Sequence, residues 1–135
     1  MRKSLDILLI EDDIDDVDLL KDALEENNVL YEMKVIMEGD KVSSYLQDLE
    51  ILPGIIVMDL NLPKTGGKEI LQEIKSSQKP FSTIPIIILT TSSSKADIDY
   101  CTNLGISKFI TKPATIEGWN NTVTNIVDIA VASSN

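Results

Sequence analysis

Five polar residues stand at the ends of four separate apolar runs. The runs and the polar residues that follow them are Leu5–Ile10 with Glu11 and Asp12, Ile55–Met58 with Asp59, Ile84–Leu89 with Thr90, and Ile106–Ile110 with Lys112 one residue later. If the runs are parallel strands, their carboxyl ends share one edge of a sheet, which is where open α/β sheets bind ligands. Three carboxylates, a hydroxyl and an ammonium would then converge at that edge.

The three carboxylates favour a divalent metal ion. Carboxylates held close together repel each other, so they stay ionised when a cation offsets their charge. Mg²⁺ prefers hard oxygen ligands and keeps several waters. We expect Asp12 and Asp59 to ligate the ion directly, together with the backbone carbonyl of Asn61. Glu11 would hold a bound water or orient the other ligands, and Mn²⁺ is the expected substitute for Mg²⁺.

A metal-bound aspartate beside an ammonium and a hydroxyl suits phosphoryl transfer. A carboxylate such as Asp59 can act as a nucleophile and form an acyl phosphate. Lys112 can offset the charge on the transferring oxygens, and Thr90 can donate a hydrogen bond to one of them. Position and charge stabilisation are most of what phosphoryl transfer requires from a protein.

The elements that position these residues alternate along the chain. Five strands are expected, at Leu5–Ile10, Tyr31–Met37, Gly54–Asp59, Ile84–Leu89 and Ile106–Ile110. Helical periodicity follows each strand, with Asp40, Ser94 and Thr115 as candidate caps and with Trp119 and Cys101 on buried faces. The pattern predicts an α/β fold, a doubly wound parallel sheet with five helices on both faces.

The first helix is expected to be amphipathic. Its apolar side would carry Ile14, Val17, Leu20 and Leu24, and its solvated side Asp15, Asp16, Asp18 and Asp22. Asp13 is expected to cap this helix, since carboxylates favour helix N-termini.

Charge and composition exclude several classes of function. The net charge is −10, and residues 6–22 hold eight acidic residues against one lysine, so charge-driven binding to nucleic acid is not expected. Cys101 is the only cysteine, which excludes an internal disulfide, and the absence of histidine excludes a phosphohistidine on this chain. The apolar runs are shorter than a membrane span, and the first residues do not resemble a signal peptide, so a cytoplasmic protein is expected.

Four motifs together resemble the receiver domain of two-component response regulators. They are Ile-Glu-Asp-Asp at 10–13, Met-Asp-Leu-Asn-Leu-Pro at 58–63, Leu-Thr at 89–90 and Phe-Ile-Thr-Lys-Pro at 109–113. The resemblance covers about residues 4–130 and implies a flavodoxin-like or CheY-like sheet in the order 2-1-3-4-5. We expect residues 1–135 to form one receiver domain without an output domain. Residues 59–67 and 89–94 are most similar to single-domain regulators associated with bacterial phytochrome-type kinases.

The resemblance implies a signalling switch rather than an enzyme with a separate substrate. It makes Asp59 the acceptor of a phosphoryl group, and it assigns Glu11 and Asp12 to the magnesium site. Thr90 becomes the switch hydroxyl, Phe109 the switch aromatic and Lys112 the partner of the phosphoryl group. The only reactions catalysed would be phosphorylation and autodephosphorylation of the protein itself.

The resemblance also implies partners. The phosphoryl donor would be a sensor histidine kinase, with phytochrome-type kinases among the candidates, or a phosphotransfer protein. The output face would comprise the fourth helix, the fifth strand and the fifth helix, which would contact a downstream protein or a second copy of the chain. Nucleic acid and membrane are not expected partners.

Three details of the site carry their own expectations. The family implies a cis bond between Lys112 and Pro113. Thr91 stands where a smaller residue is more common, so it should narrow access and slow dephosphorylation relative to Thr91→Ala. Phe109 lacks the hydroxyl that a tyrosine would offer.

Two other functions remain as alternatives. A pseudo-receiver would bind a partner without taking a phosphoryl group, but all five site residues are present. An aspartate-nucleophile phosphatase of the haloacid dehalogenase type would need an aspartate two residues after the nucleophile, where this chain has Asn61. Turnover of a small phosphate ester would identify that enzyme.

Overall fold

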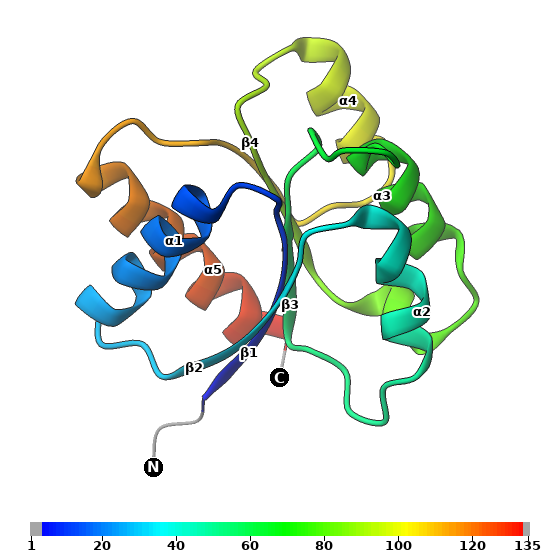
Figure 1. Ribbon diagram of the computed structural model, residues 1–135, viewed down its shortest axis with the longest axis horizontal. Coiled ribbons are helices and arrows are strands. Elements are labelled where there is room, and N and C mark those ends of the chain that lie inside the picture. Colours follow the sequence, from blue (N-terminus) through cyan, green and yellow to red (C-terminus); the bar gives the residue numbers. More distant parts are fainter. Residues whose placement is uncertain (1–3, 134–135) are drawn as a thin grey trace.

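A five-stranded parallel sheet lies between two layers of helices in the computed structural model, which describes residues 4–133 (Figure 1). The strands are β1 (Leu5–Ile10), β2 (Tyr31–Ile36), β3 (Ile55–Met58), β4 (Ile86–Thr90) and β5 (Lys108–Thr111). The helices are α1 (Ile14–Glu26), α2 (Val42–Gln47), α3 (Gly67–Ser76), α4 (Lys95–Asn103) and α5 (Ile116–Ser133). The spatial order β2-β1-β3-β4-β5, with every pair parallel, confirms the predicted fold class.

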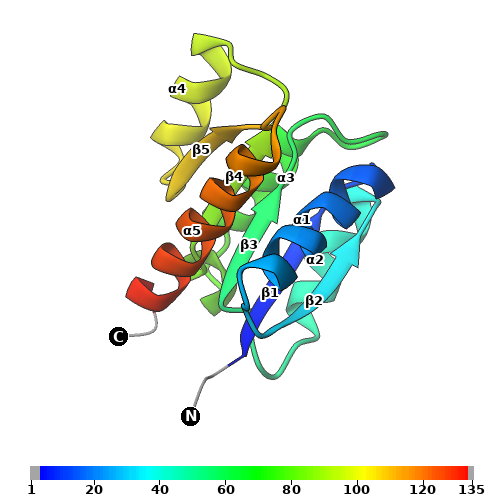
Figure 2. The ribbon, with the colours of Figure 1, turned by 90° about the vertical axis from the view of Figure 1, so that its left-hand side faces the viewer.

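The two faces of the sheet are covered by different helices. Helices α1 and α5 lie on one face, and α2, α3 and α4 lie on the other (Figures 1 and 2). Side chains of β1 alternate between the two layers, because successive residues of a strand point to opposite faces. Ile7 and Leu9 pack with residues of α1 and α5, whereas Leu8 and Ile10 pack with residues of α2 and α3.

The central strands β3 and β4 are apolar except for Thr90 at the end of β4, as is typical of strands that helices cover on both faces. All four residues of β3 and all five of β4 are buried. The edge strands β2 and β5 include exposed positions, which agrees with their more mixed sequences.

Strands β4 and β5 each begin two residues later than the sequence indicated, and β3 begins one residue later. Strand β4 begins at Ile86, because a 3₁₀ segment (Pro80–Thr83) precedes it and Pro85 can only accept a hydrogen bond, which Ile56 N donates at 2.9 Å. Strand β5 begins at Lys108. Residues 104–106 still belong to the turn that ends α4, where Gly105 has a positive φ of 89°.

Helix ends depend on local capping. Asp13 Oδ1 accepts from Asp15 N, Ser94 Oγ accepts from Asp97 N and Thr115 Oγ1 accepts from Gly118 N, as the sequence predicted. The prediction that Asp40 caps the second helix is wrong. Asp40 lies inside a 3₁₀ segment (Gly39–Lys41) that leads directly into α2, and no side chain caps that segment.

Helix α1 follows the predicted amphipathic pattern at three of its four apolar positions. Ile14, expected in the core, is 59 % exposed. Val17, Leu20 and Leu24 are buried as predicted, and so are Trp119 and Cys101 on later helices. Among residues 4–133, no helix combines the length and apolar character needed to cross a bilayer.

Candidate functional site

Backbone hydrogen bonds to neighbouring strands place three charged residues at one edge of the sheet. Glu11 N donates to Ile36 O at 3.1 Å, and Asp59 N donates to Ile10 O at 3.0 Å. Lys112 N donates to Thr90 O at 2.7 Å. Each charged residue is therefore held by the carbonyl that ends an adjacent strand, and their side chains meet just beyond the carboxyl ends of the strands.

Lys112 is the centre of the site. Its Nζ lies 2.8 Å from Glu11 Oε1, 2.8 Å from Asp59 Oδ2 and 2.6 Å from Asp16 Oδ2. Its side chain is 9 % exposed, and those of Glu11 and Asp59 are 3 % and 5 % exposed. Charge-assisted hydrogen bonds shielded from water in this way are stronger than exposed ion pairs.

The second oxygen of Asp59 is held by the loop that follows it. Asn61 N donates to Asp59 Oδ1 at 3.0 Å, while Asp59 Oδ2 faces Lys112. Both carboxylate oxygens are thus oriented before any ligand arrives. The carboxylate that the sequence proposed as nucleophile has a defined direction, which favours in-line attack over a freely rotating group.

Glu11 has an unusual protonation equilibrium. Burial raises the pKa of Glu11 to about 7, and the nearby charge of Asp59 adds to that effect. The hydrogen bonds from Lys112 and from Asp13 N act in the opposite direction. Glu11 Oε2 also accepts from Asp12 N at 3.1 Å and Asp13 N at 3.3 Å, so the side chain has partners on both oxygens.

Lys112 stays charged in this environment. Burial alone would lower the pKa of Lys112, but its hydrogen bonds to Asp16, Asp59 and Glu11 outweigh burial and raise the pKa above its ordinary value. The site therefore contains a permanent cation at neutral pH.

The carboxylates fit a divalent cation. One carboxylate oxygen from each of Glu11, Asp12 and Asp59 lies within 4.8 Å of the others. Glu11 and Asp59 are buried, whereas Asp12 is exposed to solvent. Hard oxygen donors at this spacing, with two of them shielded from water, match the ligands that Mg²⁺ and Mn²⁺ prefer.

Of the expected switch residues, Thr90 contacts the loop that follows Asp59, and Phe109 lies on the adjacent strand β5. Thr90 is fully buried, and its Oγ1 accepts from Asn61 Nδ2 at 3.4 Å and from Ser92 N at 3.5 Å. Phe109 is paired with Ile88 across β4 and β5 and packs against the core on the α2, α3 and α4 side. The structure brings the predicted residues together, and their roles in a switch stay predictions.

The expectation of a cis peptide bond between Lys112 and Pro113 is wrong. The described peptide bonds are all trans, including the one between Lys112 and Pro113. Bonds before proline favour trans by about 0.5–1 kcal/mol, and the trans bond still allows Lys112 to reach all three carboxylates.

Asp16 belongs to the site although the sequence placed it on the solvated side of α1. Its side chain is 20 % exposed and pairs with Lys112, whereas Asp15, Asp18 and Asp22 are exposed as expected. A signal was present in the spacing: Asp16 precedes the buried Leu20 by four residues, which places both on one face of the helix.

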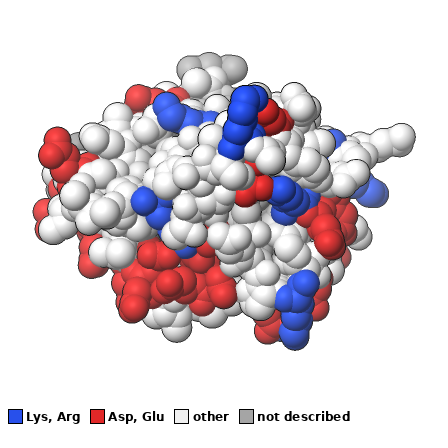
Figure 3. All heavy atoms as spheres, turned by 90° about the horizontal axis from the view of Figure 1, so that it is seen from above, with Lys and Arg blue, Asp and Glu red and all other residues white. Residues whose placement is uncertain are grey.

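The surface around the site is acidic. Seen from the carboxyl ends of the strands, acidic atoms gather in a patch on one side of the molecule (Figure 3). The residues that follow β1 supply five carboxylates within six positions: Glu11, Asp12, Asp13, Asp15 and Asp16. Such a field attracts cations and basic surfaces.

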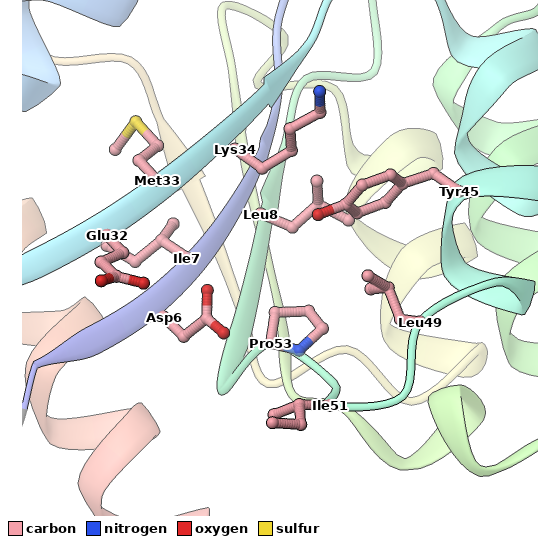
Figure 4. Close-up of a pocket in the computed structure, with 10 residues that line it drawn as sticks. All are labelled: Asp6, Ile7, Leu8, Glu32, Met33, Lys34, Tyr45, Leu49, Ile51 and Pro53. Carbon is pink, nitrogen blue, oxygen red and sulfur yellow. The ribbon is translucent and has the colours of Figure 1, made fainter.

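A second hollow lies away from this site, along the first half of β1 (Figure 4). Asp6 faces Glu32 across β1 and β2 there, and burial together with the charge of Glu32 raises the pKa of Asp6. The hollow contains none of the residues that surround Lys112. It is lined by Asp6, Ile7, Leu8, Glu32, Met33, Lys34, Tyr45, Leu49, Ile51 and Pro53.

Comparison with known proteins gives consistent results. Residues 7–124 match the family model described as the response regulator receiver domain. The response regulator Rcp1 of Synechocystis sp. is 32 % identical over 111 residues, which cover 78 % of this chain and 75 % of Rcp1. The crystal structure of the phosphorylated cyanobacterial phytochrome response regulator RcpA superposes with a TM-score of 0.86 at 30 % identity, covering 98 % of both chains.

A second solved structure bears on the metal. The Mn²⁺-bound form of response regulator Rcp1 is similar to this chain, with a TM-score of 0.78 and 31 % identity over 90 % of this chain and 91 % of that one. Together with the cluster of Glu11, Asp12 and Asp59, this similarity indicates a divalent metal site.

Proposed function

The chain belongs to the response regulator receiver family and is a response regulator of two-component signal transduction, and from this premise we propose that Asp59 is its phosphoryl acceptor. The observation that carries the proposal is the ion pair of 2.8 Å between Asp59 Oδ2 and Lys112 Nζ at the carboxyl edge of the sheet. It joins a buried carboxylate to a permanent cation beside two further acids.

The chemistry follows from the positions of the side chains. A carboxylate oxygen of Asp59 attacks the phosphorus of a phosphohistidine on a sensor kinase. The new P–O bond forms as the P–N bond breaks, and the imidazole nitrogen keeps the electron pair. Lys112 stabilises charge on the phosphoryl oxygens, and the hydroxyl of Thr90 can donate to one of them.

A divalent cation is proposed to assist this transfer, with Mg²⁺ as the ion and Mn²⁺ as a substitute. Glu11, Asp12 and Asp59 would hold it, together with the backbone carbonyl of Asn61. When bound, the ion supplies positive charge to the transferring oxygens.

The output is proposed to be a changed protein contact. Thr90 turns toward the phosphoryl group, and Phe109 on the neighbouring strand β5 responds to that movement. The affected surface would be α4, β5 and α5, which contacts a downstream protein or a second copy of the chain. The donor kinase is proposed to be a sensor histidine kinase, with the phytochrome type favoured by the similarity to RcpA.

Intact mass spectrometry tests the proposal. The protein is incubated with acetyl phosphate and Mg²⁺, beside Asp59→Asn and beside Asp48→Asn, a matched variant at an exposed position on the C-terminal end of α2. We expect the mass of one phosphoryl group on the wild type and on Asp48→Asn, and none on Asp59→Asn or with a chelator present.

The alternatives predict other outcomes. A pseudo-receiver would bind Mn²⁺ and take no phosphoryl group from acetyl phosphate or phosphoramidate. A phosphatase would release phosphate from a small phosphate ester with repeated turnover. Either result would overturn Asp59 as the acceptor in a switch.

A further inference from the structure

The Lys112 ammonium contacts carboxylates from three different parts of the chain, through hydrogen bonds to Asp16 and Asp59 and an ion pair with Glu11. An ammonium has three N–H groups, and Glu11, Asp16 and Asp59 supply three acceptors at 2.6–2.8 Å. Glu11 follows β1 and Asp59 follows β3, but Asp16 lies in the first turn of α1. The hydrogen bond to Asp16 therefore ties the end of the sheet to a helix.

Asp16 differs from the other two acceptors in its position relative to the expected metal site. Glu11 and Asp59 belong to the carboxylate cluster that fits a divalent cation, and Asp16 does not. A carboxylate that turns toward a cation holds an ammonium less tightly, because the two positive charges repel each other. Of the three acceptors, Asp16 is the one that lies outside the carboxylate cluster.

Phosphorylation of Asp59 changes the acceptor that its carboxylate offers to Lys112. When a phosphoryl group from acetyl phosphate bonds to an oxygen of Asp59, acetate leaves with the electron pair of the broken P–O bond. The negative charge of the Asp59 carboxylate is then carried by the phosphoryl oxygens. The Lys112 ammonium must then move toward the phosphoryl oxygens, and its long side chain can adopt many rotamers.

We propose that Asp16 is a positioning residue for phosphoryl transfer, which holds the Lys112 ammonium beside Asp59 while Glu11 and Asp59 exchange partners. This inference rests on the proposed function, because it assigns Asp16 a part in the reaction of Asp59. Asp16 acts through Lys112 and has no contact with the transferring group.

Local structure fixes Asp16 for this task. Asp13 caps α1, and its Oδ1 accepts from Asp15 N at 2.9 Å and from Asp16 N at 3.4 Å. The first turn is therefore held at the position where Asp16 faces the sheet edge and Asp15 faces solvent. Two adjacent aspartates on one turn offer a matched pair of substitutions.

The first test compares Asp16→Asn with Asp15→Asn. Both remove one negative charge from the same helical turn with an amide of nearly equal shape. We expect phosphorylation of Asp59 by acetyl phosphate to slow about tenfold in Asp16→Asn and less than about twofold in Asp15→Asn, since small misplacements of a catalytic group have large effects on rate. Mn²⁺ affinity, measured by calorimetry, should change equally in the two variants, because only long-range charge alters it.

Equal phosphorylation rates in the two variants would overturn the inference. So would a loss of Mn²⁺ affinity confined to Asp16→Asn, since that result would make Asp16 part of the metal site. If the wild type takes no phosphoryl group, the proposed function itself fails, and the inference falls with it.

A second test uses the wild-type protein and does not depend on any variant. In a crystal structure with Mg²⁺ and beryllofluoride, a mimic of the phosphoryl group, we expect Lys112 Nζ to remain within hydrogen-bond distance of Asp16. A separation beyond about 4 Å, the usual limit of an ion pair, would show that Asp16 does not hold Lys112 in the activated state.

Discussion

Asn61 Nδ2 lies 3.3 Å from Thr91 Oγ1, so a hydrogen bond joins the loop after β3 to the loop after β4 beside the carboxylates. Asn61 also donates to Thr90 Oγ1 at 3.4 Å. The amide of Asn61 is thus held by both threonines. These two hydrogen bonds link the loop that follows β3 to the end of β4 and the residue after it.

Thr91→Ala should accelerate loss of the phosphoryl group. The substitution removes the hydroxyl that accepts from Asn61 and leaves more space at the site. The expected increase in rate is about two- to tenfold, which corresponds to the free energy of one hydrogen bond. Intact mass measured over time after removal of acetyl phosphate gives the rate. The neighbouring exposed Ser93→Ala is the control, and equal or slower loss from Thr91→Ala would contradict the expectation.

Lys112→Ala should destabilise the metal-free protein more than the metal-bound protein. Without the ammonium, Glu11, Asp16 and Asp59 face one another with no cation among them. We expect the free energy of unfolding to fall by about 3–5 kcal/mol in chelator, as for a buried ion pair that loses one partner. Mg²⁺ should recover part of that loss because it restores positive charge.

Urea unfolding with chelator and with Mg²⁺ measures both values. Lys95→Ala serves as the control because its pair with Asp99 is exposed, and it should cost less than about 1 kcal/mol under either condition. A loss for Lys112→Ala that is independent of Mg²⁺ would argue against a shared site for the ion and the ammonium.

Gly67→Ala should disturb the backbone at the acceptor. A Cβ on Gly67 would lie 2.5 Å from both Asp59 O and Leu60 Cα, so the chain after β3 must shift. The expected loss of unfolding free energy is about 1–3 kcal/mol, the usual cost of overpacking, together with slower phosphorylation.

Gly66→Ala is the matched control for that substitution. A Cβ on Gly66 has no atom within 4 Å, so its cost should be limited to about 1 kcal/mol from a poorer N-cap. Thermal or urea unfolding compares the two variants, and equal losses would mean that the close approach of Gly67 to Asp59 is unimportant.

Asp97 should make stability depend on pH. Hydrogen bonds from Lys68 and Ser92 lower the pKa of Asp97, and the bond to Asp97 raises the pKa of Lys68. A lowered carboxyl pKa adds stability above the unfolded value of 3.8, and this stability is lost as the pH falls through the folded value. For Lys68 the added stability is present below 10.5 and is lost as the pH rises through its folded value.

The difference in Tm between the wild type and Asp97→Asn should therefore be greatest between about pH 5 and 9. It should shrink in acid below the folded pKa of Asp97 and again in strong alkali. Thermal unfolding across this range measures the difference, and one that stays constant down to pH 2 would contradict the assigned ion pair.

The sequence predicted most of the fold and the meeting of Glu11, Asp12, Asp59, Thr90 and Lys112. Each of these residues follows an apolar run, and parallel strands must end at a common edge. The alternation of buried strands and amphipathic helices similarly determined the sheet, because crossover connections are right-handed. These features depend on short-range patterns that a chain carries without its tertiary structure.

The sequence did not predict the exact residues at which several helices and strands begin and end. The late start of β5 follows from the turn around Gly105, and the failure of Asp40 as a cap follows from a 3₁₀ segment that continues into α2. Periodicity alone does not report the last turn of a helix, because that turn responds to its neighbours as much as to its own residues.

Only the tertiary structure revealed the contact between Asp16 and Lys112. Sequence periodicity placed Ile14 in the core and Asp16 in solvent, whereas the structure exposes Ile14 and leaves the Asp16 side chain 20 % exposed. The rotation of α1 is set by Val17, Leu20 and Leu24 against the sheet, and the partner of Asp16 lies 96 residues away at Lys112. Local pattern determines which residues can be buried, whereas the packing of distant elements decides which charges meet.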